Sequence, residues 1–146
     1  MNYKKITYTI LSIVSILAIW IIFSINQPPK WIGNSKQWEA EYNRESNAPK
    51  GDWTGYVYWL GENDATLVGA ELTKDGKLIH KLENTSEHLT GEKNSIIFIH
   101  TWEPMFKSED EKVELTIQWE DKEGNHEDTI VLNPKNRYFV FPSFIY

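Results

Sequence analysis

Residues 113–120, which read VELTIQWE, alternate apolar and polar side chains without a break. Successive side chains of a strand point to opposite faces of a sheet, so this period of two predicts a strand with one buried face and one wet face. The same alternation recurs in three further stretches, 38–43, 66–73 and 78–82. Two others, 53–60 and 95–102, are apolar on both faces, which is typical of central strands. The sequence therefore predicts a domain built mainly from sheet.

Turn residues separate these stretches. Asp75-Gly76 lies between two alternating runs and predicts a tight hairpin. Residues 121–125, which read DKEGN, predict a longer hairpin that leads into a strand at 129–132.

Seven or eight short strands at this spacing predict an all-β fold. We expect an immunoglobulin-like two-sheet sandwich of antiparallel strands, with a small β-barrel as the alternative. The final aromatic-rich stretch, 138–146, is interrupted by Pro142 and is expected to form an edge strand at best.

The first thirty residues differ from the rest. Ile6 to Ile25 contains no charged residue, and twenty helical residues span about 30 Å, the thickness of the hydrocarbon core of a bilayer. Lys4 and Lys5 precede this segment and the next basic residue is Lys30, so the positive-inside bias predicts a cytoplasmic N-terminus. The alternative is a cleaved signal peptide. Both interpretations place the rest of the chain outside the membrane.

These observations divide the chain into four predicted parts. They are a cytoplasmic tip (1–5), a transmembrane signal-anchor (6–25), a spacer (26–36) and an extracytoplasmic β domain (37–146). Pro28-Pro29 stiffens the spacer because paired prolines favour an extended backbone. The expected localisation is the cell membrane, with a single span.

Charge and composition exclude several classes of function. The 146 residues carry a net charge of −6, and 13 basic and 21 acidic residues remain once Lys4 and Lys5 are set aside. Such an acidic domain argues against nucleic acid as a partner, because nucleic acid demands basic patches. The chain has no cysteine, so disulfides, thiolate catalysis and cysteine-ligated zinc are excluded.

Catalytic and metal-binding patterns are missing from the sequence. There is no Gly-x-Ser-x-Gly and no His-Glu-x-x-His, so we expect neither an enzyme nor a cofactor. His80 and His100 each share a strand face with apolar neighbours and are expected to pack in the core. One acidic hairpin loop offers oxygen ligands as a weak calcium candidate, made of Asp121, Glu123, Asn125 and Asp128.

The candidate ligand-binding residues are Tyr56 and Tyr58. If Val57 and Trp59 point into the core, the two tyrosines emerge side by side on the other face of their strand. Adjacent exposed aromatic rings can stack on sugar rings or anchor a protein partner. The alternative is that a neighbouring segment of the domain covers them.

The whole architecture resembles the small, uncharacterised membrane-anchored surface proteins of Gram-positive bacteria. The resemblance lies in a lysine-tagged apolar anchor, a proline-containing spacer and a tryptophan-rich β domain without cysteine. It implies a compartment and assigns no functional residues. Our first hypothesis is a non-enzymatic binding or accessory module for a protein or peptide, which it would bind through a β face or a strand edge. The second is a module that binds cell-wall carbohydrate through Tyr56 and Tyr58.

Overall fold

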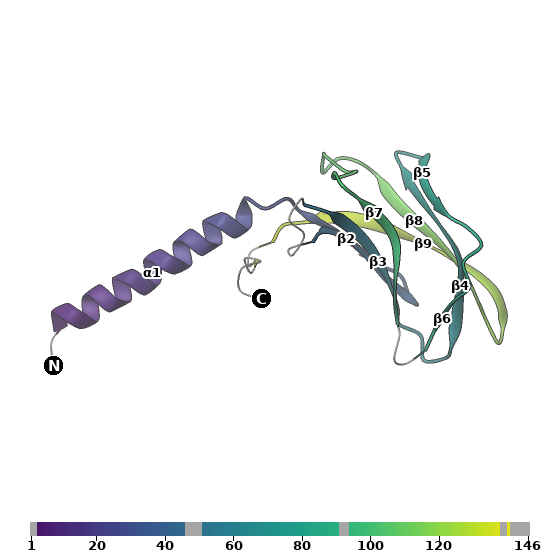
Figure 1. Ribbon diagram of the computed structural model, residues 1–146, viewed down its shortest axis with the longest axis horizontal. Coiled ribbons are helices and arrows are strands. Elements are labelled where there is room, and N and C mark those ends of the chain that lie inside the picture. The colour runs from purple at the N-terminus through teal and green to yellow at the C-terminus, as the bar shows by residue number, and fades with distance from the viewer. Residues whose placement is uncertain (1–2, 46–50, 91–93, 138–139, 141–146) are drawn as a thin grey trace. The chain divides into compact units, whose positions relative to one another are not determined.

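The computed structural model describes residues 3–45, 51–90, 94–137 and 140 (Figure 1). The chain divides into two compact units. One is the β domain, Lys30–Lys135, and the other combines Met1–Pro29 with Asn136–Tyr146.

Helix α1 extends from Tyr3 to Ile25 and is the one helix in the described residues that is long and apolar enough to cross a membrane. Its 23 residues are about 35 Å long at 1.5 Å per residue. Hydroxyl groups within it return to the helix backbone: Thr7 Oγ1 donates to the carbonyl oxygen of Tyr3 at 2.9 Å, and Ser15 Oγ to that of Leu11 at 2.9 Å. Such bonds make hydroxyl side chains tolerable in lipid.

The described residues of the β domain form nine strands. Their bounds are β1 Lys30–Asn34, β2 Trp38–Arg44, β3 Trp53–Trp59, β4 Ala65–Lys74, β5 Lys77–Leu82, β6 Glu87–Leu89, β7 Ser95–Thr101, β8 Val113–Asp121 and β9 Gly124–Lys135. Every pairing between them is antiparallel, in the order β5-β4-β8-β9-β1-β2-β3-β7, and β6 also pairs with β4.

The sheet curls until its two ends approach each other (Figure 1). His80 Nε2 in β5 lies 2.9 Å from the carbonyl oxygen of Phe98 in β7. The prediction of an all-β domain after an apolar helix is confirmed. The immunoglobulin-like sandwich is not confirmed, because backbone pairing joins all nine strands into one sheet that nearly closes into a barrel.

The inner face of the curled sheet holds the core. On β8 the predicted apolar face is buried, since Val113, Leu115, Ile117 and Trp119 have almost no exposed surface. Trp119 packs against Trp38 and Trp59, with ring centroids 5.7 and 6.0 Å away. Such aromatic contacts stabilise a small domain that has no disulfide, because each ring buries a large apolar area.

The hairpin prediction at Asp75-Gly76 is confirmed. Both residues have positive φ, 51° and 75°, as the type I′ turn requires. The second hairpin is tighter than predicted, because Asp121 pairs directly with Gly124.

The domain boundary differs from the prediction. Strand β1 lies inside the predicted spacer 26–36, so the folded domain begins at Lys30 rather than at residue 37. Its five residues are too few to show a period, although Trp31 is buried in the core. The domain ends at Lys135. The predicted edge strand at 138–146 lies outside the described residues except for Val140.

The predictions for His80 and His100 were wrong. His80 is only half-buried, at the seam between the sheet ends. His100 is exposed, because the sheet register shifts where β7 pairs with Gly55 and Tyr56, leaving Phe98 as an extra residue. A bulge of this kind moves every following side chain to the opposite face.

Candidate functional site

The predicted tyrosine pair lies on the outer face of β3. Tyr56 and Tyr58 are half-buried, while Val57 and Trp59 between and beside them are buried in the core. The two phenol rings are stacked, with centroids 6.2 Å apart and planes inclined by 28°. The prediction that they emerge side by side is therefore confirmed, and their rings are neither fully covered nor fully open.

Carboxylates on β2 and just after it hold both phenol groups. The Tyr56 hydroxyl donates to Glu45 Oε1 at 2.8 Å, and the Tyr58 hydroxyl donates to Glu41 Oε1 at 3.0 Å. Burial raises the pKa of each tyrosine, and the neighbouring carboxylates raise it further because a phenolate would be repelled by their charge. Both side chains therefore stay neutral hydrogen-bond donors at physiological pH.

Glu41 is itself fixed by its neighbours. Lys30 Nζ lies 3.5 Å from its Oε2, and Asn43 Nδ2 donates to its Oε1 at 3.1 Å. Across the sheet, Glu39 is opposite Tyr58, and Ile97 of β7 is opposite Tyr56. Because Ile97 is exposed, the outer face here combines acidic, aromatic and apolar groups.

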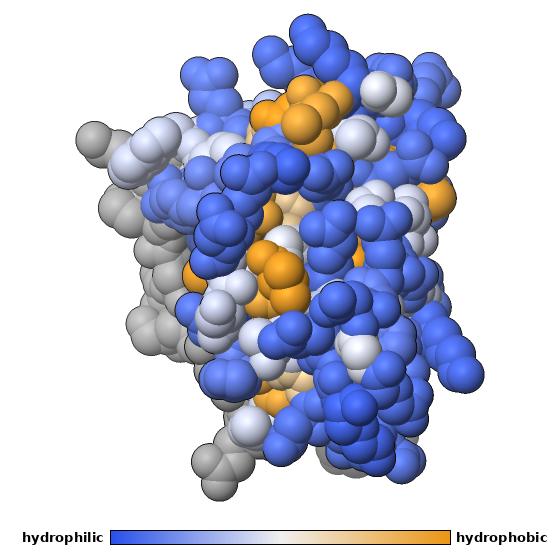
Figure 2. Space-filling model, turned by 90° about the vertical axis from the view of Figure 1, so that its right-hand side faces the viewer, coloured by the Kyte–Doolittle hydropathy of each residue, from blue (hydrophilic) through white to orange (hydrophobic). Residues whose placement is uncertain are grey.

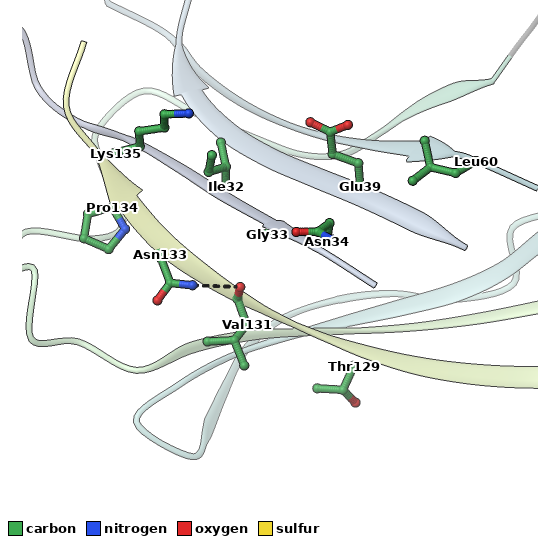
Figure 3. A pocket seen from close by; sticks show the side chains of 10 residues that line it. All are labelled: Ile32, Gly33, Asn34, Glu39, Leu60, Thr129, Val131, Asn133, Pro134 and Lys135. Carbon is green, nitrogen blue, oxygen red and sulfur yellow. Dashed lines mark hydrogen bonds between the residues drawn. The ribbon is translucent and has the colours of Figure 1, made fainter. Parts of the chain in front are cut away.

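An open hollow of about 800 Å³ lies next to this face, between β9 and the first two strands (Figure 3). Thr129, Val131 and Asn133 line one side, and Ile32, Glu39 and Leu60 line the other. Leu60 and Val131 are 51% and 46% exposed, so the hollow offers apolar surface to a ligand. Lys135 brings a positive charge to one end.

The hollow follows a part of β9 that is paired on one side. Strand β9 pairs with β8 from Gly124 to Leu132 but with β1 only from Asn133 to Lys135. Within the described residues, no strand pairs with the other side of residues 124–131. A row of backbone polar groups without strand partners is a template for another strand.

Side chains of β9 satisfy two backbone groups in this part of the strand. The amide of Thr129 donates to its neighbour Asp128 at Oδ1, 3.1 Å away. Asn133 Nδ2 donates to the carbonyl oxygen of Val131 at 3.4 Å, the bond drawn as a dashed line in Figure 3. We call Asp128 and Asn133 the edge caps. Both bonds are local, so an incoming strand could replace them without disturbing the fold.

Gly33 sets the width of the hollow. A Cβ at this position would collide with the carbonyl oxygen of Val131 and the side chain of Ile130. Only glycine therefore allows β1 to lie this close to β9 while the two strands begin to separate.

The oxygen ligands of the calcium candidate include two that are hydrogen-bonded within their own hairpin. Asp121 Oδ1 accepts from His126 Nε2 at 2.9 Å and from the amide of Glu123 at 2.7 Å. Asp128 is occupied by Thr129, and Asn125 is exposed. Within the described part of the chain, no three histidine, aspartate or glutamate side chains form a group suited to a metal ion.

The face shown in Figure 2 is mostly hydrophilic, with small, separated hydrophobic patches. It offers no extended apolar surface of the kind that marks a large protein interface. The hollow along β9 and the tyrosine pair are the two candidate binding surfaces. Comparison of the chain with protein-family models, curated proteins and solved structures finds no match.

Sequence reasoning identified the tyrosines but missed the hollow. One signal for the hollow was present, because Asn133-Pro134 follows the predicted strand at 129–132. Proline within a strand indicates an edge or a place where pairing changes. Pro134 indeed lies beyond the last residue of β9 that pairs with β8.

Proposed function

We propose that this chain is a non-enzymatic, single-pass membrane protein whose β domain lies outside the membrane and binds a protein or peptide partner. Helix α1 supports the anchor by its length and apolar character. Lys4 and Lys5 support a cytoplasmic N-terminus, because basic residues are retained on that side. The acidic, cysteine-free domain is suited to a surface module rather than to a nucleic-acid partner.

The observation that carries the proposed binding is the one-sided pairing of β9 beside an apolar hollow. An extended peptide can add to such an edge, with main-chain hydrogen bonds giving affinity and side-chain pockets giving specificity. Thr129 and Val131 offer the main-chain groups once the edge caps give way. Leu60 and Ile32 would receive an apolar side chain of the peptide.

Photocrosslinking of the full chain in intact membranes tests this function. A benzoylphenylalanine placed at Thr129 should form one defined adduct with a partner. The same group at Lys77, in the exposed β4–β5 hairpin, should form none. Leu60→Asp combined with Val131→Asp should remove most of the Thr129 adduct. Monomer alone at every position, or equal adducts from Thr129 and Lys77, would refute a partner bound along β9.

A second candidate function is the binding of cell-wall carbohydrate by Tyr56 and Tyr58. Their stacked rings stand beside Glu39 and Glu41, whose carboxylates can accept hydrogen bonds from sugar hydroxyls. Membrane vesicles that display the full chain should then sediment with purified cell wall. Tyr56→Ala with Tyr58→Ala should abolish the sedimentation, whereas Leu60→Asp with Val131→Asp should leave it unchanged. Sedimentation that persists without the tyrosines would exclude this site.

A further inference from the structure

Two oppositely charged side chains line the hollow beside β9. Lys135 of β9 and Glu39 of β2 are both exposed, and in Figure 3 they lie on either side of Ile32. The charges next to them, Lys30 and Glu41, pair with each other at 3.5 Å. Among the described residues, however, neither Lys135 nor Glu39 makes a hydrogen bond or an ion pair. Both charges are therefore open to a ligand.

The strand register gives the spacing of these two charges. Lys135 is opposite Lys30 on β1, and Glu39 is opposite Asn34 on the same strand. Positions 30 and 34 are four residues apart, which is about 13 Å along a strand at about 3.3 Å per residue. Ile32 lies midway between them and is half-buried. Along β1 the hollow thus presents a cation, an apolar group and an anion in turn.

An extended peptide has side chains at the same spacing. Residues i, i+2 and i+4 of a strand point to one face and cover about 13 Å. An acidic, an apolar and a basic residue at these positions would meet Lys135, Ile32 and Glu39. A single amino acid is too short to reach both charges, because one carbon carries its amino and carboxyl groups.

The direction of the peptide follows from the sheet. Every pairing between the described strands is antiparallel, including that of β1 with β9. A peptide that adds to β9 in the same way runs in the direction of β1. Its first residues then pass Lys135 and Ile32 before Glu39, and the residues that follow reach the free side of β9 at Val131 and Thr129.

We propose that the partner of the hollow is an extended peptide segment in which an acidic, an apolar and a basic residue follow one another at every second position. The acidic residue pairs with Lys135 and the basic residue with Glu39, while the apolar side chain packs on Ile32. This inference rests on the proposed binding of a peptide along β9. Complementary charges of this kind fix the register of a partner and exclude partners of the opposite polarity.

Two synthetic peptides test the order of the charges. The first is Thr-Glu-Thr-Val-Thr-Lys-Thr-Val-Thr, and the second exchanges its Glu and Lys. Fluorescence anisotropy with the full chain in phosphatidylcholine nanodiscs should show that the first binds about three- to tenfold more tightly. Lys135→Glu combined with Glu39→Lys should reverse this preference. Equal affinities in the wild type, an unreversed preference or no binding of either peptide would overturn the inference.

The matched control changes the same charges away from the hollow. Lys77→Glu combined with Glu123→Lys leaves the net charge as it is, and both residues are exposed in hairpin turns or beside them. This variant should keep the preference of the wild type for the first peptide. A reversal here would mean that the overall field of the domain, rather than Lys135 and Glu39, selects the peptide, and would overturn the inference.

Crosslinking from position 129 in intact membranes separates this inference from the proposed function. The adduct should fall by about three- to tenfold in Lys135→Glu and in Glu39→Lys. An adduct that is undiminished in both variants would refute the charge pairing and leave the peptide partner standing. No adduct in the wild type would refute the partner and this inference with it. An adduct of twice the mass of the chain would mean that a second copy fills the hollow, and would overturn the inference too.

Discussion

His80 and Phe98 are joined by a hydrogen bond of 2.9 Å between the imidazole Nε2 and a main-chain carbonyl oxygen. They belong to β5 and β7, the two ends of the strand order. Because a carbonyl oxygen can only accept, Nε2 carries the proton and donates it. In the described part of the chain no backbone ladder joins β5 to β7, so a side chain makes the bond across this seam.

Replacing His80 should therefore weaken the seam. His80→Ala should lower the free energy of unfolding by about 1–2 kcal/mol, the usual cost of losing a partly buried hydrogen bond. Urea denaturation of the full chain in detergent micelles would measure it, and hydrogen exchange should speed up at β5 and β7 first. His88→Ala is the control, because exposed His88 contacts Thr66 away from the seam. An equal loss in both variants would contradict the role given to His80.

Gly33 should tolerate no side chain. Gly33→Ala places a methyl group against the carbonyl oxygen of Val131, so β1 and β9 must separate. We expect a loss of about 1–3 kcal/mol in the free energy of unfolding, as for other overpacked sites. Asn34→Ala, at the exposed next residue, should change it by less than about 0.5 kcal/mol. If the Gly33→Ala variant were as stable as the wild type and β1 still paired with β9, the close contact between Gly33 and Val131 would not require glycine.

The sequence could predict a strand wherever a long period of two was present. Residues 113–119 are one such case, because alternate side chains meet one continuous core. The period could not reveal β1, which has five residues and includes Gly33. Nor could it place His100, because one extra residue at Phe98 reverses the faces of the strand.

The two candidate surfaces differ in how far the sequence could predict them. Tyr56 and Tyr58 are two residues apart on one strand, so local alternation was enough. The hollow depends on the point where β9 separates from β1. These two strands are about a hundred residues apart in the chain. Only the closure of the sheet brings Leu60 and Val131 to its opposite sides.

Asp121 should make the stability of the domain sensitive to acid. Its pKa is lowered from 3.8, first by the hydrogen bond from His126 and then by the amide of Glu123. A lowered pKa in the folded state means that the stabilisation is complete above pH 3.8 and is lost as the pH falls through the lower value. Asp121→Asn should therefore lose less stability than the wild type between pH 5 and pH 2. Glu123→Gln, which keeps the backbone amide, should follow the wild type in urea titrations.

Tyr58 should make the stability of the domain sensitive to alkaline pH. Its pKa is raised well above 10, first by burial and then by the hydrogen bond to Glu41 and the charge of that residue. The unfolded chain then releases its proton first, so the folded state loses stability as the pH rises above 10. The Tyr58→Phe variant should lose less stability than the wild type above pH 10. The Glu41→Gln variant should lower the pKa of Tyr58. Absorbance titration of the phenolate would measure the second effect, with Glu114→Gln on β8 as the unaffected control.

The edge caps provide the sharpest test of strand addition, because removing them should improve binding. Asn133→Ala frees the carbonyl oxygen of Val131, and Asp128→Ala frees the amide of Thr129. Each cap bond contributes about 0.5–1.5 kcal/mol that an incoming strand must replace, so each variant should raise the yield of the Thr129 adduct by about two- to tenfold at limiting partner.

Asn125→Ala is the control for these variants, because Asn125 lies at the exposed start of the same strand. Its adduct yield should equal that of the wild type. A lower yield in Asn133→Ala or Asp128→Ala would mean that the partner contacts those side chains directly. An unchanged yield in both variants would mean that no strand replaces the caps, and that the partner binds the hollow without adding to β9.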